Sequence, residues 1–108
     1  MAYSEHFLAT PPTREAVDAL RGAAVIEFGT PWCGHCKAAL PHVAEAFAAY
    51  PQVAHLKIED GPGQRLGRSF GVKLWPTLVF LRDGVEVARL VRPVAAEPIA
   101  DALAEIAA

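Results

Sequence analysis

The sequence contains very little cysteine, and this scarcity limits the chemistry that the chain can perform. Only two of its 108 residues are cysteines, and both lie in one six-residue stretch. A structural zinc site needs four ligands, usually from a second cysteine pair or a spaced histidine pair. The chain has no third cysteine, and its four histidines do not show that spacing. We therefore expect neither a metal nor a cofactor.

Long apolar runs and an excess of one charge are also missing. No run approaches the roughly 18 residues that a membrane-spanning helix needs. The formal net charge is −2, and the ten lysines and arginines are scattered along the sequence. The chain therefore shows no cluster of basic residues that would bind nucleic acid. The first twenty residues lack the apolar segment of a signal peptide. These absences predict a cytoplasmic protein that binds neither membranes nor nucleic acid.

The length and composition predict a single domain covering residues 1–108. The chain is 53% hydrophobic and 20% charged, so it has enough apolar residues to form one core that does not need stabilising disulfides. No internal repeat, linker or low-complexity segment interrupts it. We expect a compact domain of this size to be a monomer.

The spacing of apolar residues predicts strands that alternate with helices. An Asp-Gly pair at 83–84 favours a hairpin, and Pro41 predicts a kink inside the long helix. Alternation of this kind predicts an α/β fold, with helices on both faces of a layered sheet. The expected strands are 24–28, 53–58, 77–81 and 85–91, with a short edge strand at 5–8, and the expected helices are 14–21, 33–50, 64–70 and 97–106.

The two cysteines stand in the stretch Trp-Cys-Gly-His-Cys-Lys at 32–37, where a strand passes into a helix. Unpaired N–H groups and the helix dipole stabilise a thiolate there. Haem attachment would need a histidine directly after the second cysteine, where Lys37 stands. A purely structural disulfide would close a very short loop and gain little entropy. The stretch therefore predicts a dithiol that opens and closes a disulfide.

Together these features resemble the thioredoxin family over essentially the whole chain. The resemblance lies in the cysteine stretch at 32–37, the kink proline Pro41, the segments 70–72 and 75–77, and the turn at 83–84. It implies a thioredoxin fold, with a central mixed five-stranded sheet flanked by helices on both faces. It also places the dithiol at the N-terminus of the second helix.

The resemblance implies distinct roles for the two cysteines. Cys33, at the exposed start of the helix, would attack a substrate disulfide. Cys36, one turn further and buried, would resolve the resulting mixed disulfide. Trp32 and Gly34 would contact the substrate beside them, although Trp32 could instead be an ordinary core or interface tryptophan.

The segment at 75–77 matches the family's cis-proline turn. Pro76 is expected to carry a cis peptide bond, and the backbone before it to pair with an extended substrate peptide. Trp75 replaces a smaller family residue and would either contact the substrate or fill the groove. After Val91 the family usually has glycine, whereas this chain has Arg-Pro at 92–93, so partner docking there should differ.

Glu27 is the only charge in an apolar strand, where a buried carboxylate is rare unless it has a task. It stands in place of the family's buried acid, usually an aspartate, and would accept the Cys36 proton. The alternative is a glutamate at the strand end that reaches solvent. His55 stands where the family often has a lysine near that acid, and it would either modulate Glu27 or lie on the surface.

His35 separates this chain from typical thioredoxins, which have proline between the glycine and the second cysteine. Cys-Gly-His-Cys is similar to the motif of protein disulfide isomerases. A histidine beside the helix start adds hydrogen bonding and partial positive charge near the Cys33 thiolate. That would bias the chemistry away from pure reduction, unless His35 is simply solvated.

The leading hypothesis is a thiol–disulfide oxidoreductase that reduces protein disulfides through Cys33 and Cys36. Such a protein serves cell redox homeostasis and is re-reduced by a partner such as a thioredoxin reductase. One alternative is a disulfide oxidase or isomerase, which Cys-Gly-His-Cys favours. Another is a thioredoxin-fold binding or chaperone module whose redox chemistry is secondary.

Overall fold

The computed structural model describes residues 3–107, and from residue 14 onward the order of helices and strands is the predicted one. Within those residues four strands form one mixed sheet in the order β2-β1-β3-β4. The central strand β1 runs parallel to β2 and antiparallel to β3. The elements are α1 (Arg14–Asp18), β1 (Ala23–Gly29), α2 (Gly34–Phe47), β2 (Ala54–Glu59), α3 (Arg65–Ser69), β3 (Thr77–Arg82), β4 (Val85–Val91) and α4 (Ala96–Ala107).

The expectation of a fifth strand at 5–8 is wrong. This segment makes one backbone–backbone hydrogen bond to the sheet, in which the Leu8 N–H donates to the Lys57 carbonyl at 2.8 Å. The Ser4 N–H donates to a ring nitrogen of His55 rather than to a β2 carbonyl. A strand needs a repeated ladder of backbone bonds, so the segment lies along β2 without extending the sheet.

Two helices also end earlier than expected. The first stops at Asp18 rather than at residue 21, and the second at Phe47 rather than at residue 50. The Tyr50 N–H then donates to the Phe47 carbonyl at 2.9 Å in a tight turn. Pro51 follows, and the residue before a proline is disfavoured in helical geometry. Pro41 lies inside α2, as expected.

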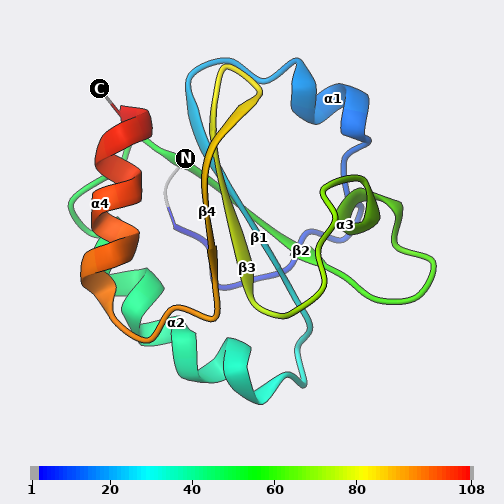
Figure 1. The fold of residues 1–108 in the computed structure, drawn as a ribbon, viewed down its shortest axis with the longest axis horizontal. Coiled ribbons are helices and arrows are strands. Elements are labelled where there is room, and N and C mark those ends of the chain that lie inside the picture. The colour runs from blue at the N-terminus through cyan, green and yellow to red at the C-terminus, as the bar shows by residue number, and fades with distance from the viewer. Residues whose placement is uncertain (1–2, 108) are drawn as a thin grey trace.

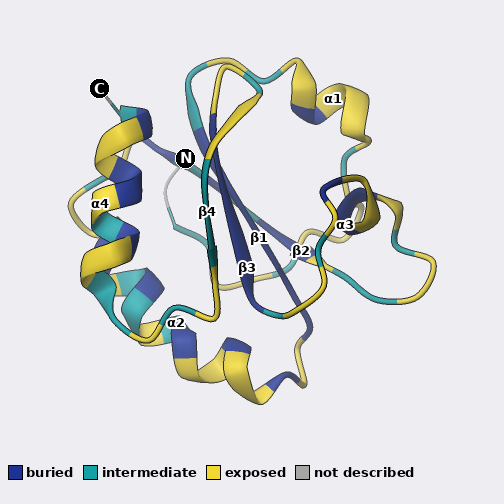
Figure 2. Ribbon diagram, in the orientation of Figure 1, coloured by how far each residue is buried: buried dark blue, intermediate teal, exposed yellow. Residues whose placement is uncertain are grey.

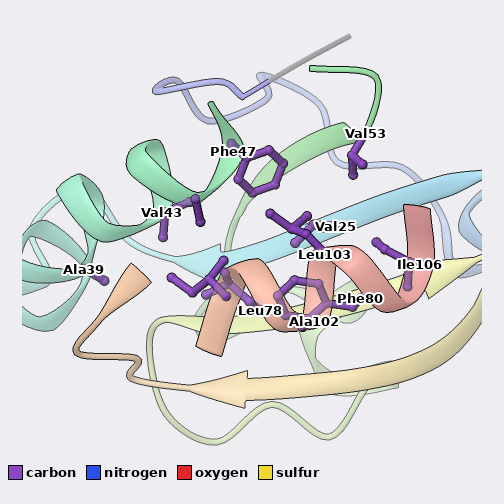
Figure 3. Packing of buried hydrophobic residues seen from close by; sticks show 12 residues of the cluster. Val25, Ala39, Val43, Phe47, Val53, Leu78, Phe80, Ala102, Leu103 and Ile106 are labelled. Carbon is purple, nitrogen blue, oxygen red and sulfur yellow. The ribbon is translucent and has the colours of Figure 1, made fainter. Parts of the chain in front are cut away.

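Helices cover both faces of the sheet, and the alternation of β1 divides the core between them. Figure 1 shows α2 and α4 on one side of the strands and α1 and α3 on the other. Val25 points to the α2 and α4 side, where it packs with Phe80 and Leu103 in the cluster of Figure 3. Ile26 and Phe28 point to the α1 and α3 side. Each face of β1 therefore belongs to a different apolar cluster.

The central strands are buried and β4 forms a more exposed edge. β1 and β3 are dark blue along most of their length in Figure 2, whereas β4 is largely intermediate or exposed. The predicted hairpin between β3 and β4 is confirmed, with positive φ at Asp83 (51°) and Gly84 (80°). The buried strand β1 leads directly to the cysteine stretch and gives it a rigid base.

Candidate active site

The dithiol lies at the first turn of α2, directly after β1. Cys33 is the N-cap residue, with extended backbone angles of φ −78° and ψ 120°. Its Sγ accepts a hydrogen bond from the Cys36 N–H at 3.2 Å. This bond and the N-terminal end of the helix both stabilise negative charge on that sulfur. Both cysteines are free thiols in this structure.

Both cysteines are nearly covered, so the expectation that Cys33 is exposed is wrong. Cys33 keeps 8% of its surface and Cys36 keeps 7%. The turn before β3 lies against Cys33, whose Sγ is 3.9 Å from the Trp75 carbonyl oxygen. This turn therefore contributes to the cover over the Cys33 sulfur.

The Cys36 thiol binds its proton more tightly than an ordinary cysteine does. Burial, followed by the hydrogen bond with Cys33, raises the pKa of the Cys36 thiol from 9.0 to about 12. The negative charge of Glu27 adds to this rise in pKa. Cys36 therefore stays protonated at neutral pH and needs a base before it can attack.

Gly29 is a site residue that sequence reasoning missed. A Cβ at this position would lie 2.6 Å from the Cys36 sulfur, well inside contact distance. Only glycine therefore allows the end of β1 to approach the buried thiol. The available signal was a glycine that closes a buried strand just before the cysteine stretch.

Glu27 and His55 form a buried pair beneath α2. His55 Nε2 lies 2.8 Å from Glu27 Oε1, and their side chains are 0% and 2% exposed. The Ser4 N–H donates to His55 Nδ1 at 2.8 Å. Because a backbone N–H can only donate, Nδ1 carries no proton and Nε2–H donates to the carboxylate. The solvent-facing alternatives for both residues are therefore wrong.

The cis-proline turn forms the other wall of the site. The Trp75–Pro76 peptide bond is cis, which confirms the expectation. Trp75 Nε1 donates to Asp60 Oδ2 at 2.9 Å, and the Trp75 ring meets Trp32 edge-on at 5.8 Å between centroids. Trp32 itself remains 70% exposed. Trp75 is therefore half-buried and held against Asp60 and Trp32, and Trp32 is not a core tryptophan.

The remaining predicted site residues lie on the surface of the first turn. Gly34 and His35 are exposed, and the His35 side chain makes no hydrogen bond with residues 3–107. No cluster of three metal-binding side chains occurs in that described part. Within the same range, no helix has the length and apolar character to cross a bilayer.

A dithiol at a strand-to-helix junction, facing a cis-proline turn in this sheet, defines a thioredoxin-fold redox site. The chain belongs to the thioredoxin family, whose family model matches residues 9–105. It is similar to the structure of reduced thioredoxin 2 from Pseudomonas aeruginosa PAO1, with 56% identity, a TM-score of 0.86 and 97% of each chain covered.

Two curated relatives differ in how much of their length the chain matches. It is 42% identical over 71 residues to thioredoxin from Chlamydia muridarum, covering 65% of this chain and 69% of that one. It is 47% identical over 66 residues to protein disulfide-isomerase A2 from Homo sapiens, covering 57% of this chain. That match spans only 13% of the isomerase, so it concerns one domain of a longer protein.

Proposed function

We propose that this protein is a thiol–disulfide oxidoreductase that reduces disulfides in other proteins. The observation that supports this most is the inequality of the two thiols. Cys33 Sγ receives a backbone N–H at the helix start, whereas Cys36 holds its proton with a pKa of about 12. One sulfur is prepared to attack, and the other is kept inert until the attack has occurred.

The reaction has two exchange steps. The Cys33 thiolate attacks one sulfur of the substrate disulfide, a mixed disulfide forms, and the first substrate sulfur leaves as a thiolate. Cys36 then passes its proton to Glu27 and attacks Cys33 Sγ, which releases the second substrate thiolate. The substrate gains two electrons and becomes a dithiol after protonation. Cys33 and Cys36 lose two electrons and become a disulfide.

Glu27 suits the base role because its surroundings keep it buried and oriented. The carboxylate accepts the Nε2–H of His55 through one oxygen at 2.8 Å. The neutral histidine orients the carboxylate without placing a full positive charge beside it. His55 is therefore a positioning residue in this proposal, and Glu27 is the group that receives the proton.

The cycle needs an external reductant to restore the dithiol. A reducing partner such as a thioredoxin reductase would return two electrons to the disulfide. We place the protein in the cytoplasm because a reductant works where thiols are kept reduced. We expect a monomer because the chain is a compact domain of only 108 residues. Both of its cysteines belong to the site, so no structural disulfide depends on an oxidising compartment.

Insulin reduction in the presence of dithiothreitol tests the proposal. We expect the protein to accelerate precipitation of the released insulin chain, and a variant with both cysteines changed to serine to leave it at the background rate. A wild-type protein that also stays at background would refute the proposal. The same result would favour a binding or chaperone module.

Disulfide oxidation or isomerisation is the second candidate, favoured by His35 and by the matched isomerase domain. A more stable thiolate makes a stronger oxidant, and a tenfold gain in the stability of the dithiol form shifts a two-electron potential by about 30 mV. Titration against glutathione should show the wild type to be more oxidising than His35→Pro by tens of millivolts. Proline is tolerated early in a helix, so the variant should fold. An equal or more oxidising variant would remove this candidate.

A further inference from the structure

Arg92 is held against the cis-proline turn from the end of β4. Its φ of 51° lies in the left-handed region, which a residue other than glycine adopts rarely. Its backbone N–H donates to the Pro76 carbonyl at 2.9 Å, and its side-chain Nε donates to the Trp75 carbonyl at 3.0 Å. Two bonds therefore hold this unusual conformation in place and direct the guanidinium to the active-site wall.

The carbonyl that receives the Arg92 side chain is also the one that faces the attacking sulfur. The Trp75 oxygen lies 3.9 Å from Cys33 Sγ and 3.0 Å from Arg92 Nε. Arg92 is exposed, and its two terminal nitrogens have no hydrogen-bond acceptor among residues 3–107. A guanidinium offers five N–H donors in a planar fork that fits a carboxylate. Its unused donors therefore remain available beside the site of attack.

Other cations border the same site, although the whole chain has a net charge of −2. Lys37 is exposed in the first turn of α2, next to Cys36. Lys73 is exposed and lines a pocket of about 320 Å³ together with Trp75. The carboxylate of that pocket, Asp60, already accepts a hydrogen bond from the Trp75 indole. Asp60 keeps its negative charge, because the indole N–H is neutral, and it partly offsets Lys73. Lys37 and Arg92 form no ion pair with a carboxylate among residues 3–107.

We propose that Arg92 is a specificity-determining residue that binds an acidic side chain beside the disulfide of a protein partner. This inference rests on the proposed function, because it concerns which disulfides the dithiol attacks. Nε stays on the Trp75 carbonyl, and the terminal nitrogens receive the partner's carboxylate in a charge-assisted pair. Lys37 and Lys73 add attraction over a longer range, which raises the rate of encounter with acidic surfaces.

Three disulfide peptides test the proposal, identical except that Glu, Gln or Lys follows the target cysteine. At low ionic strength the wild type should reduce the Glu peptide with a kcat/KM about threefold to tenfold above that for the Lys peptide. High salt should narrow this ratio. Arg92→Gln should remove most of the preference and leave only the small part due to Lys37 and Lys73. Arg92→Lys should keep more of it because the charge remains without the fork.

Arg89→Gln is the matched control. Arg89 lies on β4, three residues before Arg92, but its guanidinium pairs with Glu86 at 2.8 Å, so the ratio should match that of the wild type. An unchanged Glu-to-Lys ratio in Arg92→Gln would overturn the proposal. An equal loss of rate for all three peptides would also overturn it, because Arg92 would then act on the dithiol and not on the partner. A wild type that reduces none of them would refute the proposed function itself, and this proposal with it.

Discussion

The two faces of the sheet use the same strands for different purposes. On the α1 and α3 side the buried core contains no ionisable side chain from β1, and its apolar cluster has the members Val17, Ile26, Phe28, Ile58, Leu66, Phe70, Val79 and Leu81. On the α2 and α4 side, Val25 is followed two residues later by Glu27, which is paired with His55 and buried near the dithiol. Because side chains alternate along a strand, one face can supply stability while the other holds polar groups that would destabilise a purely structural core.

The largest expected contrast comes from one change on each face. Cys33→Ser should abolish disulfide reduction and leave the free energy of unfolding almost unchanged. Ile26→Ala should lower that free energy by about 2–5 kcal/mol because it leaves a cavity in the opposite cluster, while the dithiol keeps its reactivity. Insulin reduction and denaturant unfolding of both variants measure the contrast. Loss of activity in a folded Ile26→Ala protein would show that the two faces are not independent.

Cys36→Ser separates the two thiols of the active face. It should still attack a substrate disulfide through Cys33 but stall as a mixed disulfide, since no second thiol can resolve it. Mass spectrometry of the protein after incubation with a disulfide substrate would detect the adduct. An adduct with Cys33→Ser, and none with Cys36→Ser, would reverse the assigned order of attack.

Glu27→Gln tests the polar pair with little change in shape. The amide oxygen can still accept the His55 proton, so the fold should persist, but the amide cannot take the proton of Cys36. We expect resolution to slow by about a hundredfold, with a smaller effect on the first attack. Rapid-mixing kinetics on a fluorescent disulfide separate the steps. Glu59→Gln, at the exposed end of β2, is the control, and an equal rate in both variants would remove Glu27 from the mechanism.

A pair of glycines tests how closely the active face is packed. Gly29→Ala should lower the free energy of unfolding by about 1–3 kcal/mol, because its Cβ would meet the Cys36 sulfur at 2.6 Å. Gly34→Ala should change it by less than about 1 kcal/mol, since a Cβ there would meet no atom within 4 Å beyond its chain neighbours and the backbone of its own helix. Equal denaturation midpoints for the two variants would mean that the end of β1 can shift away from Cys36 at little cost in free energy.

The last effect concerns stability at alkaline pH, outside the range in which the protein works. The pKa of Cys36 is raised from 9.0 to about 12, so between these values the unfolded chain binds fewer protons than the folded one. The free energy of unfolding should therefore fall as the pH rises from about 9 to about 12, and this contribution is complete below about 9. The fall should be shallower in Cys36→Ser. Parallel slopes for the two proteins would contradict a raised pKa at this thiol.

The sequence predicted those parts of the fold and the site that depend on short segments of the chain. The cysteine stretch, the order of elements and the cis bond before Pro76 all follow from short segments. The conformation of the segment at 5–8 and the burial of Cys33 by the turn before β3 were not predicted. Both depend on contacts between parts of the chain that are distant in the sequence. The proton position on His55 is set by Ser4, which lies 51 residues away in the sequence.

Trp32 and Trp75 are the only tryptophans in the chain, and both border the dithiol. The indole fluorescence of the protein therefore originates entirely at its active site. Formation of the disulfide, docking of a partner or displacement of the Asp60 hydrogen bond would each change that emission without an added label. The molecule thus contains its own optical probe, and each exchange step can be followed in real time in the unmodified protein.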